Sequence, residues 1–142
     1  MAILTRMQVL YDSKIGTAQE LAQQIGKYFK CKCDQVPPAY PCENQKIIVI
    51  VFEGYAKMTK PLYDFCRSLS TKRSQTACLV AVSNGDADFG EVKSVVEGAG
   101  LKVVATKDIV AKKGMIGKPK LTDADIQAAI SFVDATTDKL IS

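Results

Sequence analysis

The sequence predicts a doubly wound α/β domain, in which a five-stranded parallel sheet lies between two layers of helices. Two observations predict this three-layer α/β/α arrangement. Short apolar runs alternate with amphipathic stretches of helical period along the chain, and several of these runs are apolar at every position. A strand that is apolar throughout is covered on both faces, as helices on both sides of a parallel sheet would cover it. The length fits one domain, and we see no repeat or linker that would divide residues 1–142.

The first half of the chain predicts three strands and one helix. Residues 7–11 indicate the first strand, and apolar residues at helical spacing over 15–29 indicate the first helix. Residues 31–36 follow as a short second strand. Three prolines within 37–41 then interrupt regular structure. We therefore expect a loop, and no full helix, before the third strand at 46–52.

The second half alternates helix and strand. A helix is expected over 60–69, with Pro61 in its first turn, where the missing N–H costs nothing. Asp125 follows Thr122 by three residues and predicts a near capping box at the start of the last helix. The remaining elements are expected in this order: a strand at 77–82, a helix at 91–98, a strand at 101–105, a lysine-rich loop and a final helix from Thr122.

Composition excludes several classes of function. The chain has no histidine, which excludes serine–histidine and cysteine–histidine catalysis. No apolar run approaches the ~18 residues of a membrane helix, and the first residues do not predict a secretory signal. We expect a soluble, cytoplasmic protein with no membrane contact. The formal net charge is +4, but aromatic residues do not interleave with the lysines, so we predict no nucleic-acid binding.

The five cysteines are Cys31, Cys33, Cys42, Cys66 and Cys78. Their odd number, without a secretory context, argues against a disulfide framework. Cys31 and Cys33 form a C-x-C pair, but no second pair completes a zinc site. We interpret the two as strand residues that point to opposite faces of the sheet, and we predict no metal site.

The loop after the first strand carries the clearest candidate site. It runs from Asp12 through Ala18 directly into a helix. In a parallel sheet, ligands bind beyond the carboxyl ends of the strands, and N–H groups at a helix start attract anions. Ser13 and Thr17 add hydroxyl donors, and Gly16 permits a close approach of the backbone. The residues alone are equally compatible with an anion site and with plain helix capping.

The same loop, Tyr-Asp-Ser-Lys-Ile-Gly-Thr-Ala from residue 11 onward, resembles the phosphate loop of the flavodoxin family, Ser/Thr-x-Thr-Gly-x-Thr. Ser13 and Gly16 match the pattern. Ile15 and Ala18 stand where the family prefers hydroxyls, although Thr17 is adjacent. These departures predict either weaker phosphate binding or compensation by the charge of Lys14.

The resemblance extends over nearly the whole chain. Residues 52–55 and 57–61 are similar to the family's second flavin loop, and residues 83–90 are similar to its third. It implies an FMN cofactor, with Tyr55, Phe89 and Met58 as walls of the ring site and Gly54 as a turn whose peptide reorients on one-electron reduction. The cofactor-binding residues expected from the resemblance are Asp12, Ser13, Lys14, Ile15, Gly16, Thr17, Ala18, Glu53, Gly54, Tyr55, Ala56, Met58, Ser83, Asn84, Gly85, Asp86, Phe89 and Gly90.

The function expected from this resemblance is that of an electron carrier that holds FMN and serves a redox partner protein. No catalytic residues are assigned. Two alternatives stay open: an interaction module of the same fold without FMN, and a small FMN-dependent reductase. Acids such as Glu53 and Asp86 near the ring would lower its potential. Lysines from Lys107 to Lys120 are expected to form a loop that attracts an acidic partner.

Overall fold

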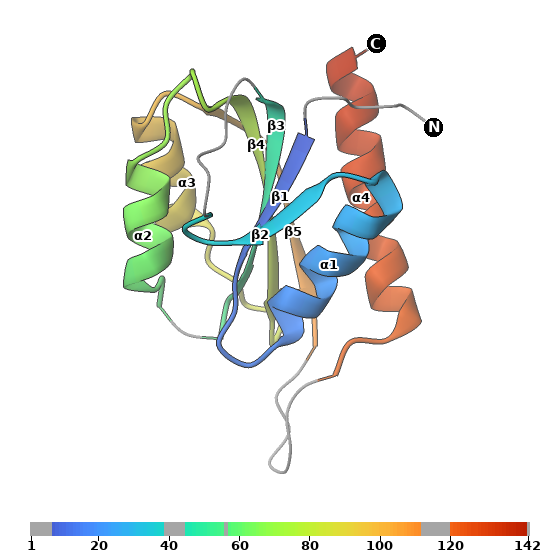
Figure 1. Ribbon diagram of the computed structural model, residues 1–142. Coiled ribbons are helices and arrows are strands. Elements are labelled where there is room, and N and C mark those ends of the chain that lie inside the picture. Colours follow the sequence, from blue (N-terminus) through green and yellow to red (C-terminus); the bar gives the residue numbers. More distant parts are fainter. Residues whose placement is uncertain (1–6, 39–44, 56, 112–119, 142) are drawn as a thin grey trace.

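Five parallel strands form the centre of the molecule, in the order β2-β1-β3-β4-β5 (Figure 1). The computed structural model describes residues 7–38, 45–55, 57–111 and 120–141. The strands are β1 (Met7–Asp12), β2 (Lys32–Gln35), β3 (Gln45–Glu53), β4 (Ser74–Ser83) and β5 (Lys102–Val110). The predicted five-stranded parallel α/β sheet is confirmed.

Two pairs of helices cover the two faces of the sheet. Figure 1 shows α1 (Thr17–Phe29) beside α4 (Asp123–Ile141) on one face, and α2 (Lys60–Arg67) beside α3 (Gly90–Gly98) on the other. Among the described residues, no helix lies between β2 and β3. Residues 39–44 of this stretch lie outside the described residues, so the loop expected from the prolines stays a prediction there.

Alternation along each strand divides the core between the two faces. On β3, Ile47, Val49 and Val51 pack in the core beneath α1 and α4. Ile48 and Ile50 pack in the core beneath α2 and α3. All five side chains are fully buried. This two-sided burial is why β3 is apolar at nearly every position.

The last strand is longer than the sequence predicted. β5 continues to Val110 and pairs with β4 as far as Ser83. It is an edge strand, and its exposed Thr106 and Lys107 give it no continuous apolar pattern. Lys107 therefore belongs to the strand and not to the lysine-rich loop in which we expected it.

The start of α4 confirms the predicted capping box. The Thr122 N–H donates to the Asp125 carboxylate at 2.9 Å, and the Asp125 N–H donates to the Thr122 hydroxyl at 3.1 Å. The two residues thus satisfy each other's backbone donors at the helix start. Within the part of the chain that the structure describes, no helix combines the length and the apolar character needed to cross a membrane.

Candidate functional site

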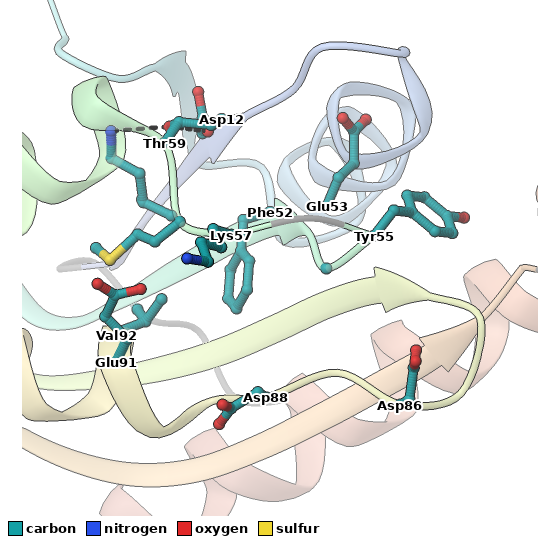
Figure 2. Close-up of a pocket in the computed structure, with 13 residues that line it drawn as sticks. Asp12, Phe52, Glu53, Tyr55, Lys57, Thr59, Asp86, Asp88, Glu91 and Val92 are labelled. Atoms are coloured by element: carbon teal, nitrogen blue, oxygen red, sulfur yellow. Dashed lines mark hydrogen bonds between the residues drawn. The ribbon is translucent and has the colours of Figure 1, made fainter.

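The loops after β1, β3 and β4 meet at the carboxyl edge of the sheet, where two adjoining cavities lie between them. The larger is about 230 Å³ and lies between the β3–α2 loop and the start of α3 (Figure 2). The smaller is about 110 Å³ and reaches Lys14 and Ile15 in the β1–α1 loop. Both are lined by Asp12, Glu53, Tyr55, Lys57 and Thr59. This edge is where ligands bind in open parallel sheets.

The β1–α1 loop is arranged as an anion cradle. Gly16 is the N-cap of α1 and has φ +98°, a left-handed conformation that glycine adopts without strain. No side chain of the loop caps the helix. The N–H groups at the helix start therefore need an acceptor from elsewhere in the chain.

Glu53, the last residue of β3, supplies that acceptor. Figure 2 shows its carboxylate directed toward the loop and the first turn of α1. Its Oε1 accepts from two backbone N–H groups, those of Lys14 at 2.7 Å and Ile15 at 3.1 Å. Its Oε2 accepts from the hydroxyls of Ser13 at 2.5 Å and Thr17 at 3.1 Å. The same oxygen accepts from the N–H of Ala18 at 3.2 Å. The sequence analysis expected Glu53 beside a ring; in the structure it lines both cavities, and its carboxylate is bonded to the phosphate-type loop.

The environment of Glu53 favours its charged form. Burial alone would raise the pKa of this carboxyl, because the charge is partly removed from water. The hydrogen bonds from Ser13, Lys14, Ala18 and Ile15 outweigh burial and leave its pKa below the ordinary value. The loop thus holds an anion supplied by its own chain.

Tyr55 and Met58 line the larger cavity. Their expected role as walls for a flat ligand stays a prediction. Tyr55 is half-buried against the α1–α4 core, and its hydroxyl donates to the Ala111 carbonyl. That bond connects the β3–α2 loop to the end of β5. Ala56, which the sequence also suggested, lies outside the described residues.

Gly54 is required for a close approach between two loops. Its N–H donates to the Val82 carbonyl at 2.8 Å, which extends the β3–β4 ladder. A Cβ at this position would lie 3.2 Å from the Cβ of Ala87 and 3.3 Å from that of Ser83. Gly54 is not among the positive-φ glycines of the described chain, so crowding is the constraint here. The expected reorientation on reduction stays a prediction.

In the β4–α3 loop, some residues line the cavity and others hold the loop in its conformation. Asp86 lines the cavity. Phe89 packs edge-on against Phe52, with ring centroids 5.9 Å apart, and it is absent from the described linings of both cavities. Gly90 begins α3, and its N–H donates to Asp88. Asn84 is exposed.

Asp108 supports this loop and was missed by the sequence analysis. Buried Ser83 donates to its Oδ1 at 2.6 Å, and the Ala87 N–H donates to its Oδ2 at 3.2 Å. Ser83 also accepts from the N–H of Gly85, which has φ +108°. Ser83 and Gly85 thus shape the loop. No local pattern indicated Asp108, because it lies on a strand that was expected to end earlier.

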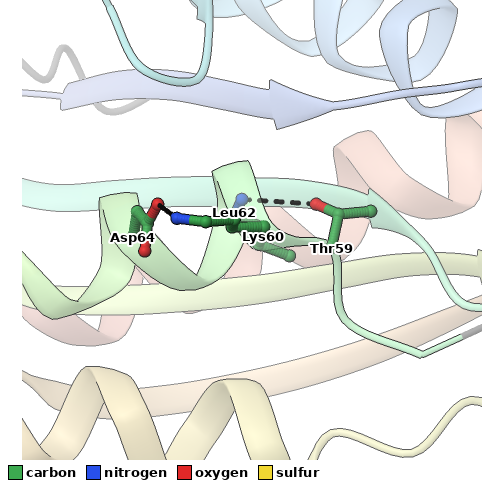
Figure 3. Close-up of polar contacts among 4 residues, drawn as sticks. All are labelled: Thr59, Lys60, Leu62 and Asp64. Atoms are coloured by element: carbon green, nitrogen blue, oxygen red, sulfur yellow. Dashed lines mark hydrogen bonds and ion pairs between the residues drawn. The ribbon is translucent and has the colours of Figure 1, made fainter.

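Thr59 lies in the loop that the sequence analysis compared with the second flavin loop, but sequence reasoning gave it no role of its own. It is the N-cap of α2 and accepts from the Leu62 N–H at 3.3 Å, beside an ion pair of 2.7 Å between Lys60 and Asp64 (Figure 3). Its hydroxyl also donates to Asp12 at 2.6 Å (Figure 2). Thr59 therefore joins the carboxyl end of β1 to the start of α2. A threonine immediately before a predicted helix with proline in its first turn was the available signal.

The cysteines form no site within the described residues. Burial raises the pKa of the Cys31 and Cys33 thiols to about 11, so neither is a thiolate at neutral pH. Both pack against the α1–α4 core, so our expectation of opposite faces was wrong. Side chains two residues apart along a strand share a face. No group of potential metal ligands occurs in the described chain, and Cys42 lies outside it.

Comparison with known proteins identifies the fold. The sequence matches no protein-family model and no curated protein. The structure is similar to a flavodoxin from the domain Archaea, with a TM-score of 0.72 and 14% identity over 96% of this chain and 99% of that chain. Flavodoxin 2 from Bacillus cereus gives a TM-score of 0.64 and 12% identity over 95% and 99% of the two chains.

A third similar structure is a flavoprotein in complex with FMN from Lactobacillus acidophilus. Its TM-score is 0.58, with 15% identity over 72% of this chain and 92% of that chain. Together these similarities show that the chain has the flavodoxin-like fold that its loops suggested.

Proposed function

We propose that this protein binds FMN at the carboxyl edge of its sheet and transfers electrons to a redox partner. One observation carries the proposal: a preformed anion cradle at the start of α1 adjoins a cavity with an aromatic wall. The similar fold of a flavoprotein in complex with FMN supports it. FMN combines a phosphate with a flat, mostly apolar ring, so it needs these two features side by side.

The residues of the cradle fit the phosphate chemically. Ser13 and Thr17 offer hydroxyl donors, and Lys14, Ile15 and Ala18 offer backbone N–H groups, all now used by a carboxylate. The positive end of the α1 dipole favours an anion at the same place.

The ring would lie against the β3–α2 loop, where Tyr55 and Met58 offer apolar surface. When bound, FMN supplies one- and two-electron chemistry, while the protein supplies orientation and electrostatics. Acids around the larger cavity, including Asp12, Asp86 and Glu91, would disfavour a reduced, anionic ring and so lower its potential.

One observation favours a second candidate, the interaction module without FMN. Glu53 already satisfies the donors that a phosphate would use. In a chain that never binds flavin, such an internal anion would stabilise the start of α1 permanently. The two candidates differ in whether a flavin can enter the loop.

An absorbance spectrum and two titrations separate these candidates. We expect purified protein to be yellow, or to become so with FMN, and to quench FMN fluorescence on binding. The site has one anion cradle and no second one within the described residues, so FAD should bind more weakly. FAD binding as tight as FMN would contradict the assignment of FMN, and no binding of either would favour the interaction module.

The proposed partner is an acidic protein that docks beside the flavin edge. Exposed Lys107 and Lys120 flank residues 112–119, which hold three further lysines and lie outside the described residues. Positive charge here would raise the association rate with an acidic surface. We also place the protein in the cytoplasm. The odd number of cysteines, which argues against a disulfide framework, supports a reducing compartment.

A further inference from the structure

The Glu53 carboxylate occupies the anion cradle in the way that a bound ligand would. It reaches the cradle from β3, more than thirty residues away in sequence, and both of its oxygens are engaged. Three of the five donors are backbone N–H groups, whose positions depend on the backbone and not on a rotamer. A carboxylate held by several N–H donors at a helix start is strongly stabilised.

A phosphate group cannot share these donors with Glu53. The N–H groups of Lys14, Ile15 and Ala18 converge on a space that the carboxylate fills. Two anions in that space would also repel each other. Any ligand whose affinity depends on its phosphate must therefore displace this side chain first.

The part of the site that is lined by Tyr55 and Met58 does not require Glu53 to be displaced. The larger cavity is lined by Tyr55, Met58 and Val92 as well as by Glu53. Figure 2 shows the Glu53 carboxylate directed away from Val92 and toward the first turn of α1. A ring that lies against Tyr55, Met58 and Val92 need not contact the two carboxylate oxygens of Glu53, which the loop donors engage. A flat ring can therefore enter the larger cavity directly, whereas a phosphate can enter the β1–α1 loop only after Glu53 has left it.

We propose that Glu53 is the specificity-determining residue of this site, an internal anion that competes with the flavin phosphate for the β1–α1 loop. This inference rests on the proposed function. It follows that the protein distinguishes FMN from riboflavin, which lacks the phosphate, far less than an open cradle would. The carboxylate must leave the loop before the phosphate can enter it.

Titration of three proteins with FMN and riboflavin tests the proposal. Glu53→Gln keeps the size of the side chain but removes its charge, and its amide NH₂ group faces the loop donors. We expect this variant to bind FMN at least tenfold more tightly than the natural protein, about 1.4 kcal/mol, with riboflavin affinity nearly unchanged. Glu97→Gln, an exposed acid on α3, is the matched control and should change neither. An FMN affinity that does not rise, or a rise shared by riboflavin, overturns the proposal.

Inorganic phosphate provides a test that needs no flavin. In thermal unfolding, phosphate should raise the midpoint of Glu53→Gln above that in sodium chloride of equal ionic strength, while the natural protein should show no such rise. If neither protein binds flavin but this contrast appears, the proposed function fails and the competition stands. Equal responses of the two proteins would overturn the competition.

If Glu53→Gln does not fold, the proposal can still be tested on the natural protein. The amide signals of Lys14, Ile15 and Ala18 can be followed by NMR as phosphate is added. While Glu53 holds the loop, these signals should not move. Shifts at millimolar phosphate would show that the loop is open and would overturn the proposal.

Discussion

The side chain of Glu53, on β3, affects the stability of the neighbouring β1–α1 region. It accepts from the N–H of Ala18 in the first turn of α1, for which no side chain of the loop provides a cap, and from the N–H groups of Lys14 and Ile15 in the preceding loop. A buried donor without a partner destabilises a protein. The charge state of Glu53 therefore affects the stability of the β1–α1 region.

Acid should destabilise the natural protein in part through this residue. The folded-state pKa of Glu53 lies below its unfolded value of about 4.3. Its contribution is thus fully present above that value and is lost as the pH falls through the folded pKa. We expect the difference in unfolding free energy between the natural protein and Glu53→Gln to shrink over this range. Urea unfolding at a series of pH values measures it, and a difference that is constant with pH would contradict the prediction.

Tyr55 should contribute to flavin binding through its ring. Stacked aromatic pairs add ~0.5–1.5 kcal/mol beyond burial, so Tyr55→Ala should weaken FMN binding by about tenfold. Tyr55→Phe keeps the ring but loses the hydrogen bond to Ala111, and it should bind FMN nearly as well. Fluorescence titration measures both variants.

Phe89 offers a comparison within the same site. It packs against Phe52 and not along the described cavity linings, so Phe89→Ala should affect stability more than affinity. If Tyr55→Ala and Phe89→Ala both leave FMN affinity unchanged, the walls of the ring site lie elsewhere.

At the scale of the element, the start of α1 depends on the backbone of Gly16. A Cβ there would meet nothing within 4 Å, so the constraint is its φ of +98° and not crowding. A branched residue is strained in this conformation by roughly 1–2 kcal/mol. The strain would either reshape the loop or weaken the whole fold.

We expect Gly16→Val to fold with reduced stability and to lose FMN binding. Gly98→Val is a matched control, because the Cβ of that residue also meets nothing within 4 Å and its φ is not positive. Gly98 lies on α3, where valine is tolerated at least as well as glycine. Circular dichroism and FMN titration of both variants check the prediction. Normal FMN binding by a folded Gly16→Val would show that the loop does not hold the phosphate.

At the scale of the whole molecule, charges of opposite sign are separated along the chain. Acids line the larger cavity, while lysines are concentrated between Lys107 and Lys120 and give the protein its net positive charge. Such separation orients a charged partner during approach. It raises the rate of association more than the affinity.

Electron transfer to the partner should therefore slow as ionic strength rises, because screening limits charge attraction to ~8 Å at physiological salt. Lys107→Glu combined with Lys120→Glu should slow it further and leave FMN affinity unchanged. Lys27→Glu, near the carboxyl end of α1 and so at the opposite edge of the sheet, is the control. Stopped-flow kinetics over a salt series measures these rates. Rates that do not respond to salt or to the double reversal would show that the lysines do not guide docking.

The fold class could be predicted from the sequence alone, because burial on two faces leaves an apolar pattern in each strand separately. β3 is apolar at position after position, and the amphipathic stretches between strands mark the helices. The start of the last helix was also visible, since its capping box involves residues only three apart. The carboxyl end of β5 was not predicted, because an exposed edge strand has no continuous apolar pattern.

The arrangement of the candidate site depends on contacts between distant parts of the chain and became apparent only in the folded structure. β1 and β3 are neighbours in the sheet, and their register pairs Asp12 with Phe52. That register brings Glu53 beside Ser13 and into the cradle, although some forty residues separate them in the chain. The contacts of Asp108 and Thr59 arise in the same way, from strands and loops that meet at one edge. Such pairings depend on distances in space, so no local pattern of residue types reveals them.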